Sequence, residues 1–313
     1  MNKLSRSLPM KVLLAWFAGS AISVLAACPD TDSDALAWLD RMSHSLRQVS
    51  YEGVVTFSRG EDLQVMQVSH DVNAGLESEY LTQLTGQGAR ITRADHPLDC
   101  VHPGHRMLRM GEEMSRGNCG IAANYRLAVA AGERVAGRAT VNIRVKPRDM
   151  YRYGYLMALD KETGLLLKTR TLARGGVTLE HFQFANLRIG KPSSVDEQQN
   201  LAYRAPHFAP QVTGHTLGQQ WRVRWLPAGF ARTDDATQDA GRRTFTDGLA
   251  VFSVFVESLA RPVKPGEGVV RKGSTTSYTR GVRVGGQSAL VTVVGEVPLN
   301  TARMVADSVA WSS

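Results

Sequence analysis

The chain has 313 residues, of which 43% are hydrophobic and 21% are charged. This balance is typical of a folded protein, and only one long apolar run occurs, at the N-terminus, which excludes a protein with many membrane spans. The formal charge of +8 at pH 7 is modest and scattered along the chain, so charge alone identifies no partner.

The first 27 residues predict a secretory signal peptide. Lys3, Arg6 and Lys11 form a basic segment, and an uncharged apolar run follows at 12–27. This run is short for a membrane span and ends at small residues, as signal peptides do. We therefore expect export from the cytoplasm. For an exported chain nucleic acid is not an expected partner, whereas anionic lipid, lipopolysaccharide phosphate or an acidic polypeptide is.

The end of the apolar run suggests a membrane anchor. Leu25-Ala26-Ala27-Cys28 matches the lipobox at which bacterial lipoproteins are cleaved and acylated on the cysteine. Acylation of Cys28 would attach the protein to a membrane. The alternative is ordinary cleavage after Ala26, which leaves Cys28 as a plain thiol.

The other two cysteines, Cys100 and Cys119, lie in one polar stretch and predict a disulfide in an oxidising compartment. A loop of this length would contribute about 3 kcal/mol on the chain-entropy model. The alternative is a metal site, because His96, His102 and His105 surround Cys100. This spacing fits no usual ligand set, so we expect no metal and no cofactor.

The N-terminal half predicts one helix followed by many strands. The helix should begin near Asp34 and be capped by Thr31 or Ser33. Residues 160–164 have the composition of a hairpin turn, and successive hairpins build a curved antiparallel sheet. Alternating apolar and polar residues predict strands at 51–58, 63–70, 78–85, 89–93, 141–145, 155–159, 165–172 and 177–187.

Three methionines, Met107, Met110 and Met114, recur at helical spacing between the two cysteines. Methionine side chains adapt to apolar ligands. The segment therefore predicts either a short helix packed on the sheet or a lid that lines an acyl chain.

A polar, proline-containing stretch at 191–215 predicts a linker between two domains. The predicted organisation is a signal peptide at 1–27, a first domain at 28–190 and a second, small α+β domain at 216–313. The second domain should hold an antiparallel sheet and a final helix that begins at the cap Asn300 and runs through Val309. Its strands are predicted at 221–225, 230–233, 242–246, 250–256, 275–284 and 289–294.

Catalytic motifs are missing from the sequence. There is no nucleophile elbow, no zinc-binding helix and no glycine-rich phosphate loop. His181 lies in a predicted strand, and the acidic residues form no close pair suited to acid–base chemistry. The sequence therefore favours a binding protein over an enzyme.

Several segments, in the same order through both predicted domains, resemble the RseB/MucB family. One of them is Val145-Lys146-Pro147-Arg148-Asp149, and another is Trp225-Leu226-Pro227-Ala228-Gly229-Phe230. The remaining segments that carry the resemblance are 135–138, 151–155, 159–165, 180–184, 247–257 and 291–298.

The resemblance implies a periplasmic regulator of an envelope-stress sigma factor. Such a protein binds the periplasmic domain of a transmembrane anti-sigma factor and shields it from site-1 proteolysis until lipid or lipopolysaccharide releases it. The implied fold is mainly β (α+β), with a large N-terminal unclosed antiparallel β-barrel with helices, similar to lipoprotein carriers, and a smaller C-terminal antiparallel sheet with one helix. The lipobox and the cysteine pair depart from what the family leads us to expect.

Two sets of residues are candidate binding sites. Basic and aromatic side chains lie close together in the sequence after the strand at 141–145, a pattern suited to phosphate and acyl groups. The alternative is a solvated strand end with tyrosines that pack in the core. Trp225 and Phe230 are candidates for binding the partner, with packing at a domain interface or in a core as the alternative. The predicted lipid- or phosphate-binding residues are Lys146, Arg148, Tyr151, Arg152, Tyr153, Tyr155, Met107 and Met110.

A periplasmic carrier of lipid or lipoproteins is the alternative function, because a curved sheet suits it equally. The second predicted domain favours the regulator, since simple carriers of this fold end near Gly190. The sequence leaves open whether the protein forms a homo-oligomer.

Overall fold

The computed structural model describes residues 31–73, 76–86, 90–97, 119–192, 221–233, 241–259, 266–284 and 287–311. The predicted signal peptide, Cys28, Cys100, Met107 and Met110 lie outside these residues. So does most of the predicted linker, and the predicted domain bounds stay a prediction.

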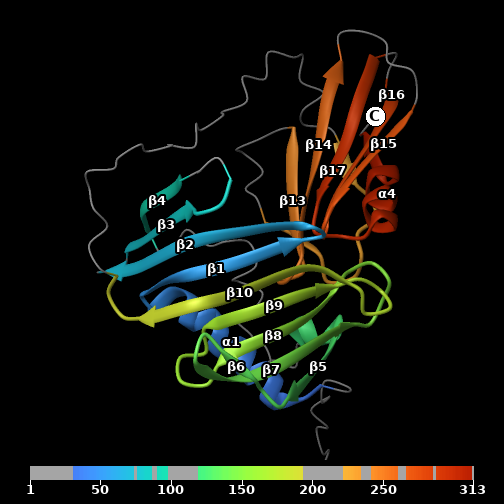
Figure 1. The fold of residues 1–313 in the computed structure, drawn as a ribbon. Coiled ribbons are helices and arrows are strands. Elements are labelled where there is room, and N and C mark those ends of the chain that lie inside the picture. The colour runs from blue at the N-terminus through green and yellow to red at the C-terminus, as the bar shows by residue number, and fades with distance from the viewer. Residues whose placement is uncertain are drawn as a thin grey trace, which may run out of the picture.

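A ten-stranded antiparallel sheet forms the larger part of the structure (Figure 1). The strand order is β4-β3-β2-β1-β10-β9-β8-β7-β5, and β6 pairs with β7. In the described residues the edge strands β4 and β5 do not pair with each other, so the sheet is open, as predicted. The strands are β1 (Tyr51–Arg59), β2 (Asp62–Asn73), β3 (Leu76–Gln83), β4 (Arg90–Pro97), β5 (Tyr125–Ala130), β6 (Arg134–Val135), β7 (Arg138–Pro147), β8 (Gly154–Asp160), β9 (Leu166–Leu172) and β10 (Thr178–Ile189).

Helix α1 (Ser33–Gln48) packs against this sheet through Ala35, Leu39 and Met42, which are buried with residues of β5, β7 and β8. Its cap is Asp32, whereas Thr31 or Ser33 was expected. One Asp32 oxygen accepts the amide hydrogens of the first turn, and the other accepts from the amide of Val129 in β5 at 2.9 Å. The cap therefore also ties the helix to the sheet, a contact that is invisible in the local sequence.

A second antiparallel sheet has the order β12-β13-β14-β17-β16-β15, and its strands run crosswise to those of the large sheet (Figure 1). Helix α4 (Leu299–Asp307) packs on it, and β11 pairs with β18 beside it. This small α+β unit is the architecture predicted for the C-terminal part. Its strands are β11 (Trp221–Val223), β12 (Ala231–Arg232), β13 (Arg242–Thr246), β14 (Val251–Leu259), β15 (Glu267–Lys272), β16 (Thr275–Val284), β17 (Gln287–Gly295) and β18 (Val309–Trp311).

Strand β14 lies between β13 and β17, and its residues Phe252, Val254 and Val256 are buried. Apolar residues on both faces of a strand are typical of such a central position. The predicted bounds of the last helix were wrong. Pro298 takes the cap position in place of Asn300, and its carbonyl oxygen accepts from the amides of Thr301 and Ala302. The chain leaves the helix after Asp307 to form β18.

Candidate functional site at the junction of the two sheets

The loop between β7 and β8, residues 148–153, joins the two sheets, and we call it the junction loop. Tyr151 packs edge-on against the ring of Trp225, with 5.1 Å between the ring centroids. The loop also bonds to the start of α4 and to the residues before it. These bonds run from Asn300 Nδ2 to Met150 O (3.4 Å), from Thr301 Oγ1 to Tyr151 O (2.8 Å) and from Tyr153 Oη to Val297 O (3.2 Å).

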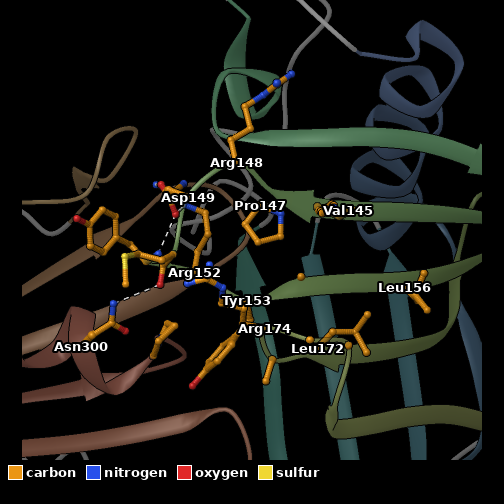
Figure 2. Close-up of a pocket in the computed structure, with 18 of the residues that line it drawn as sticks. Val145, Pro147, Arg148, Asp149, Arg152, Tyr153, Leu156, Leu172, Arg174 and Asn300 are labelled. Carbon is orange, nitrogen blue, oxygen red and sulfur yellow. Dashed lines mark hydrogen bonds and ion pairs between the residues drawn. The ribbon is translucent and has the colours of Figure 1, made fainter.

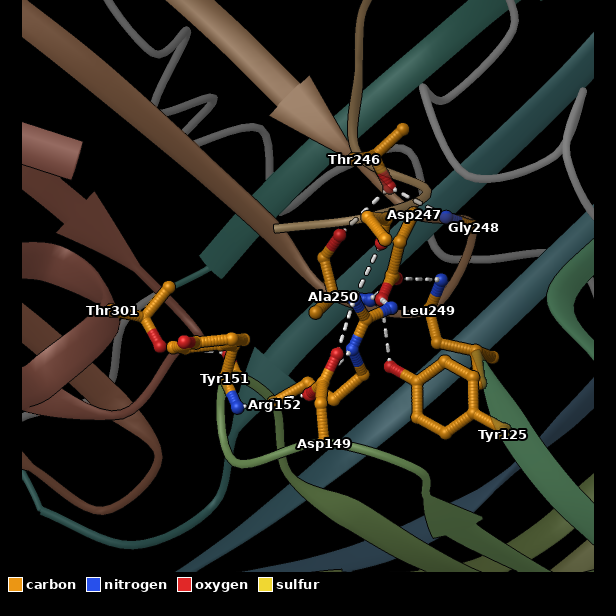
Figure 3. A network of polar contacts seen from close by, with 11 residues as sticks. Tyr125, Asp149, Tyr151, Arg152, Thr246, Asp247, Gly248, Leu249, Ala250 and Thr301 are labelled. Carbon is orange, nitrogen blue, oxygen red and sulfur yellow. Dashed lines mark hydrogen bonds and ion pairs between the residues drawn. The ribbon is translucent and has the colours of Figure 1, made fainter. Parts of the chain in front are cut away.

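The centre of the junction is the side chain of Arg152, which is completely buried (Figure 3). Its Nη1 donates to Asp247 Oδ2 at 2.6 Å, and Nη2 donates to the carbonyl oxygen of Ala228 at 2.5 Å. Asp149, in the same loop, lies 3.0 Å from Nη2. Asp247 and Ala228 belong to turns that precede β14 and β12, so one guanidinium group holds two turns of the small unit.

Asp247 is equally well satisfied. Its Oδ2 also accepts the hydroxyl hydrogen of Tyr125 at 2.8 Å, while Oδ1 accepts from the amides of Leu249 and Ala250. Burial and the Asp247 carboxylate raise the pKa of Tyr125 well above its usual value, so the hydroxyl stays a donor. A buried ion pair with all its hydrogen bonds made is costly to break, because separating the partners leaves a buried charge uncompensated.

A second contact joins the units away from the junction loop. Glu180 of β10 accepts from the amide and hydroxyl groups of Ser274, at 3.1 and 2.7 Å, and pairs with Arg59 at 2.7 Å. Gly273 has a positive φ of 61°, and a Cβ there would lie 2.3 Å from a Glu180 oxygen. A side chain at this position would displace the Glu180 carboxylate and strain the backbone, so glycine suits this close approach.

A pocket of about 1060 Å³ opens beside the junction loop (Figure 2). The large sheet contributes most of its wall, and the small unit contributes Arg271 and 298–300. Six basic residues line it together with one acid, Asp149, which is already bound to Arg152. The basic residues are Arg144, Lys146, Arg148, Arg152, Arg174 and Arg271, and the apolar part of the lining includes Pro147, Met150, Leu156, Leu172, Pro298 and Leu299.

Four of these cations, Arg144, Lys146, Arg174 and Arg271, are exposed, and none of them pairs with a carboxylate elsewhere in the described ranges. Arg144 and Lys146 reach the pocket because β7 alternates, with Ile143 and Val145 turned into the core against α1. A lining that combines exposed cations with apolar side chains is suited to an amphiphile with an anionic head group and a hydrocarbon tail.

Five of the predicted lipid-binding residues line this pocket: Lys146, Arg148, Tyr151, Arg152 and Tyr153. The charge of Arg152 is already neutralised, and the Nε of Arg148 donates to a backbone carbonyl. Tyr155 does not join them, because its buried side chain packs in the core beneath α1. Lipid or phosphate binding by these residues stays a prediction.

Trp225 and Phe230 occupy the interface and core positions that the sequence left open as an alternative. Phe230 is buried and packs on Phe252, with 5.1 Å between ring centroids. Trp225 is half-buried against Tyr151 of the junction loop. Partner binding by either residue stays a prediction.

Sequence reasoning missed Asp247, Tyr125, Arg144 and Arg174 as site residues. Lone acids and tyrosines carry no local signal of a contact between distant segments. A signal was nevertheless present, because the segments that carry the family resemblance meet at the junction. They include 145–149, 151–155, 225–230, 247–257 and 291–298.

The described residues include only part of those on which the disulfide and metal-site predictions depend. Cys119 is disulfide-bonded, and its predicted partner Cys100 lies outside the described residues. No group of three or more potential metal ligands occurs in the part of the chain that the structure describes. Over the same part, no helix is both long and apolar enough to cross a membrane.

Comparison with known proteins finds the same family in the N-terminal and C-terminal parts of the chain. The model of the MucB/RseB N-terminal domain matches residues 34–203, and that of the MucB/RseB C-terminal domain matches 215–310. The sigma factor AlgU regulatory protein MucB of Pseudomonas aeruginosa is 33% identical over 91% of this chain and 94% of its own. The sigma-E factor regulatory protein RseB of Escherichia coli K12 is 24% identical, over 95% of this chain and 98% of its own.

A solved structure extends the similarity to three dimensions. The crystal structure of MucB in complex with MucA(peri) has 32% sequence identity and a TM-score of 0.69, and the match covers 90% of this chain and all of that MucB chain. The family models together span far more than half of the sequence. The chain therefore belongs to the MucB/RseB family.

Proposed function

We propose that the protein is a periplasmic regulator of an envelope-stress sigma factor. It binds the periplasmic domain of a transmembrane anti-sigma factor and shields that domain from site-1 proteolysis. The observation that carries this proposal is similarity along both domains to MucB, which was crystallised with MucA(peri). Relatives named for regulation also favour a binding role over catalysis.

Lipid or lipopolysaccharide releases the anti-sigma factor, and the pocket at the junction receives the lipid. Its support is the composition of the lining, in which Arg144, Lys146 and Arg174 occur together with apolar side chains. Phosphate groups bind such guanidinium and ammonium groups strongly, and the apolar part removes hydrocarbon from water. Release requires that lipid and anti-sigma factor prefer different arrangements or overlapping surfaces, because a ligand with equal affinity for both states shifts nothing.

Acylation of Cys28, a domain boundary within 191–215 and a disulfide between Cys100 and Cys119 belong to the same proposal. Mass spectrometry of the exported protein tests two of them. A mass increase on the N-terminal peptide would show the lipid, and a peptide linking Cys100 to Cys119 would show the disulfide. An unmodified Cys28 would contradict the anchor and leave the regulator free in the periplasm.

A protease-protection assay tests the function. The exported protein is mixed with the host's anti-sigma periplasmic domain and its site-1 protease, with and without lipopolysaccharide. We expect slow cleavage in the absence of lipid and fast cleavage in its presence. Unprotected substrate would contradict the regulator.

The same pocket favours a second candidate function, a lipid or lipoprotein carrier. A carrier would take up acyl chains and transfer them to acceptor membranes without protecting the anti-sigma factor. Transfer without protection in the assay above would therefore replace the first proposal with the second.

A further inference from the structure

We propose that Arg152 and Asp247 are positioning residues for the pocket. Their ion pair, which we call the clamp, holds the two domains in the arrangement that forms the pocket. A ligand bound in the pocket in turn stabilises that arrangement. The inference rests on the proposed function only in taking an anionic amphiphile as the occupant. It assigns that ligand a closing effect on the domains rather than an opening one.

Both domains contribute to the wall of the pocket. Residues of β7, β8 and β9 form one side, while Arg271 and 298–300 of the C-terminal domain form another. Moving the domains apart would remove that second side and one of its cations. The pocket is therefore complete only while the junction is closed.

The junction loop belongs both to the wall of the pocket and to the contact between the two domains. All six residues of the junction loop line the pocket, and Met150, Tyr151, Arg152 and Tyr153 each bond to the C-terminal domain. A change in the position of this loop cannot alter one feature without altering the other (Figures 2 and 3).

The ion pair itself is not accessible to a ligand. The side chains of Arg152 and Asp247 have no exposed surface, and both Asp247 oxygens accept hydrogen bonds that the protein itself supplies. The pair is therefore placed to hold the loop and not to bind the ligand. Exposed Arg144, Lys146 and Arg174 supply the charge that an anion would meet.

Ligand binding and domain closure are therefore linked equilibria. Contacts to both walls exist only in the closed arrangement, so the ligand binds that arrangement more tightly and favours it. Linkage is reciprocal, so a variant that lowers the population of the closed arrangement weakens ligand binding in proportion to the fall in that population. Couplings of this kind commonly amount to about 5- to 150-fold in affinity.

Hydrogen exchange of the exported protein, measured with dodecyl phosphate as the probe, tests the inference. The amides of Leu249 and Ala250 bond to Asp247 but do not line the pocket, so their exchange reports on the clamp and not on ligand contact. We expect dodecyl phosphate to slow their exchange, and dodecyl maltoside, with the same chain and no charge, to leave it unchanged. Faster exchange with the phosphate would show opening and overturn the inference.

Affinity measured by calorimetry provides the second readout. Asp247→Asn keeps the Oδ1 that caps its own turn but loses the charge at Oδ2, and we expect it to bind dodecyl phosphate about 10- to 100-fold more weakly. Tyr125→Phe, which removes a single hydrogen bond to Asp247, should fold if Asp247→Asn does not, and should show a smaller loss. Unchanged affinity in the variants that fold would contradict the linkage.

Arg138→Lys is the matched control, because Arg138 forms a two-pronged pair with Asp160 inside the N-terminal domain. It should leave the affinity and the exchange of Leu249 and Ala250 unchanged. An equal effect of inorganic phosphate would support the clamp with a free anion as the ligand. Absence of binding by both phosphates would overturn the linkage and the proposed lipid site, whereas failed protection with intact linkage would overturn the regulator alone.

Discussion

Arg152 connects the two domains through a single buried side chain. Its guanidinium group lies 5.3 Å from the ring centroid of Tyr125 and 5.2 Å from that of Phe230, and it binds Asp247 between them. The sequence indicated Arg152 as a phosphate ligand because an arginine beside tyrosines is equally typical of a surface. Burial distinguishes the two roles, and burial depends on segments nearly 100 residues away.

Replacing Arg152 with Met should lower the free energy of unfolding by about 3–5 kcal/mol, because Asp247 would remain buried without a counter-charge. Urea denaturation at neutral pH measures the change. Tyr125→Phe should cost less, about 1 kcal/mol, because it removes one hydrogen bond and leaves the ion pair. Equal stability of the Arg152→Met variant and the wild type would show that the pair is dispensable.

Asp160 predicts a pH dependence. Burial acts to raise the pKa of this carboxyl group, but hydrogen bonds from Arg138 and Thr163 outweigh it and hold the pKa below its usual value. Its contribution to stability is therefore complete above about pH 4 and is lost as the pH falls through the depressed pKa. The difference in unfolding free energy between wild type and Asp160→Asn should shrink on acidification in this range. A difference independent of pH would contradict the assignment.

At the scale of elements, the sequence predicted most of the strands but missed some, including β5, whose buried and exposed residues alternate. Strand β14 carries apolar residues on both faces, and its pairing with β13 and β17 places it inside the sheet. Strand β15 was missed because all six of its residues are exposed at the sheet edge, so no buried face marks it. The end of α4 was misplaced because Val309 suits a strand as well as a helix.

The cap of α1 gives a prediction at this scale. Asp32→Ala should cost about 1 kcal/mol of stability, within the usual range of 0.5–2 for an N-cap, since the first-turn amides lose their acceptor. The amide of Val129 loses its partner too, so exchange should accelerate at the β5 edge as well as in the helix. Thermal unfolding and hydrogen exchange measure the two effects, and Ser33→Ala, beside the cap, is the control. A matching loss in Ser33→Ala would argue against Asp32 as the cap.

At the scale of the whole molecule, the sequence identified the family and five residues of the pocket wall, but not the side of the pocket that comes from the C-terminal domain. Chain order does not reveal that 148–153 and 297–301 meet, because that contact depends on how the two sheets cross. The segments shared with the family were the only trace of it.

The two domains should unfold together, because contacts at the junction and at Glu180 hold them to each other. Calorimetry of the wild type should show one transition, and Asp247→Asn should show two. Two well-separated transitions in the wild type would mean that the domains are energetically independent, and the clamp would then have no structural basis.

The central claim is that lipid in the junction pocket controls protection of the anti-sigma factor. The direct test is the lipopolysaccharide concentration that gives half-maximal loss of protection, compared between wild type and Lys146→Gln/Arg174→Gln. Arg170→Gln, an exposed basic residue of β9 outside the pocket, is the control. We predict that the double variant still protects but needs about tenfold or more lipid for release, and that the control behaves as wild type. Identical release curves for all three proteins would contradict the claim.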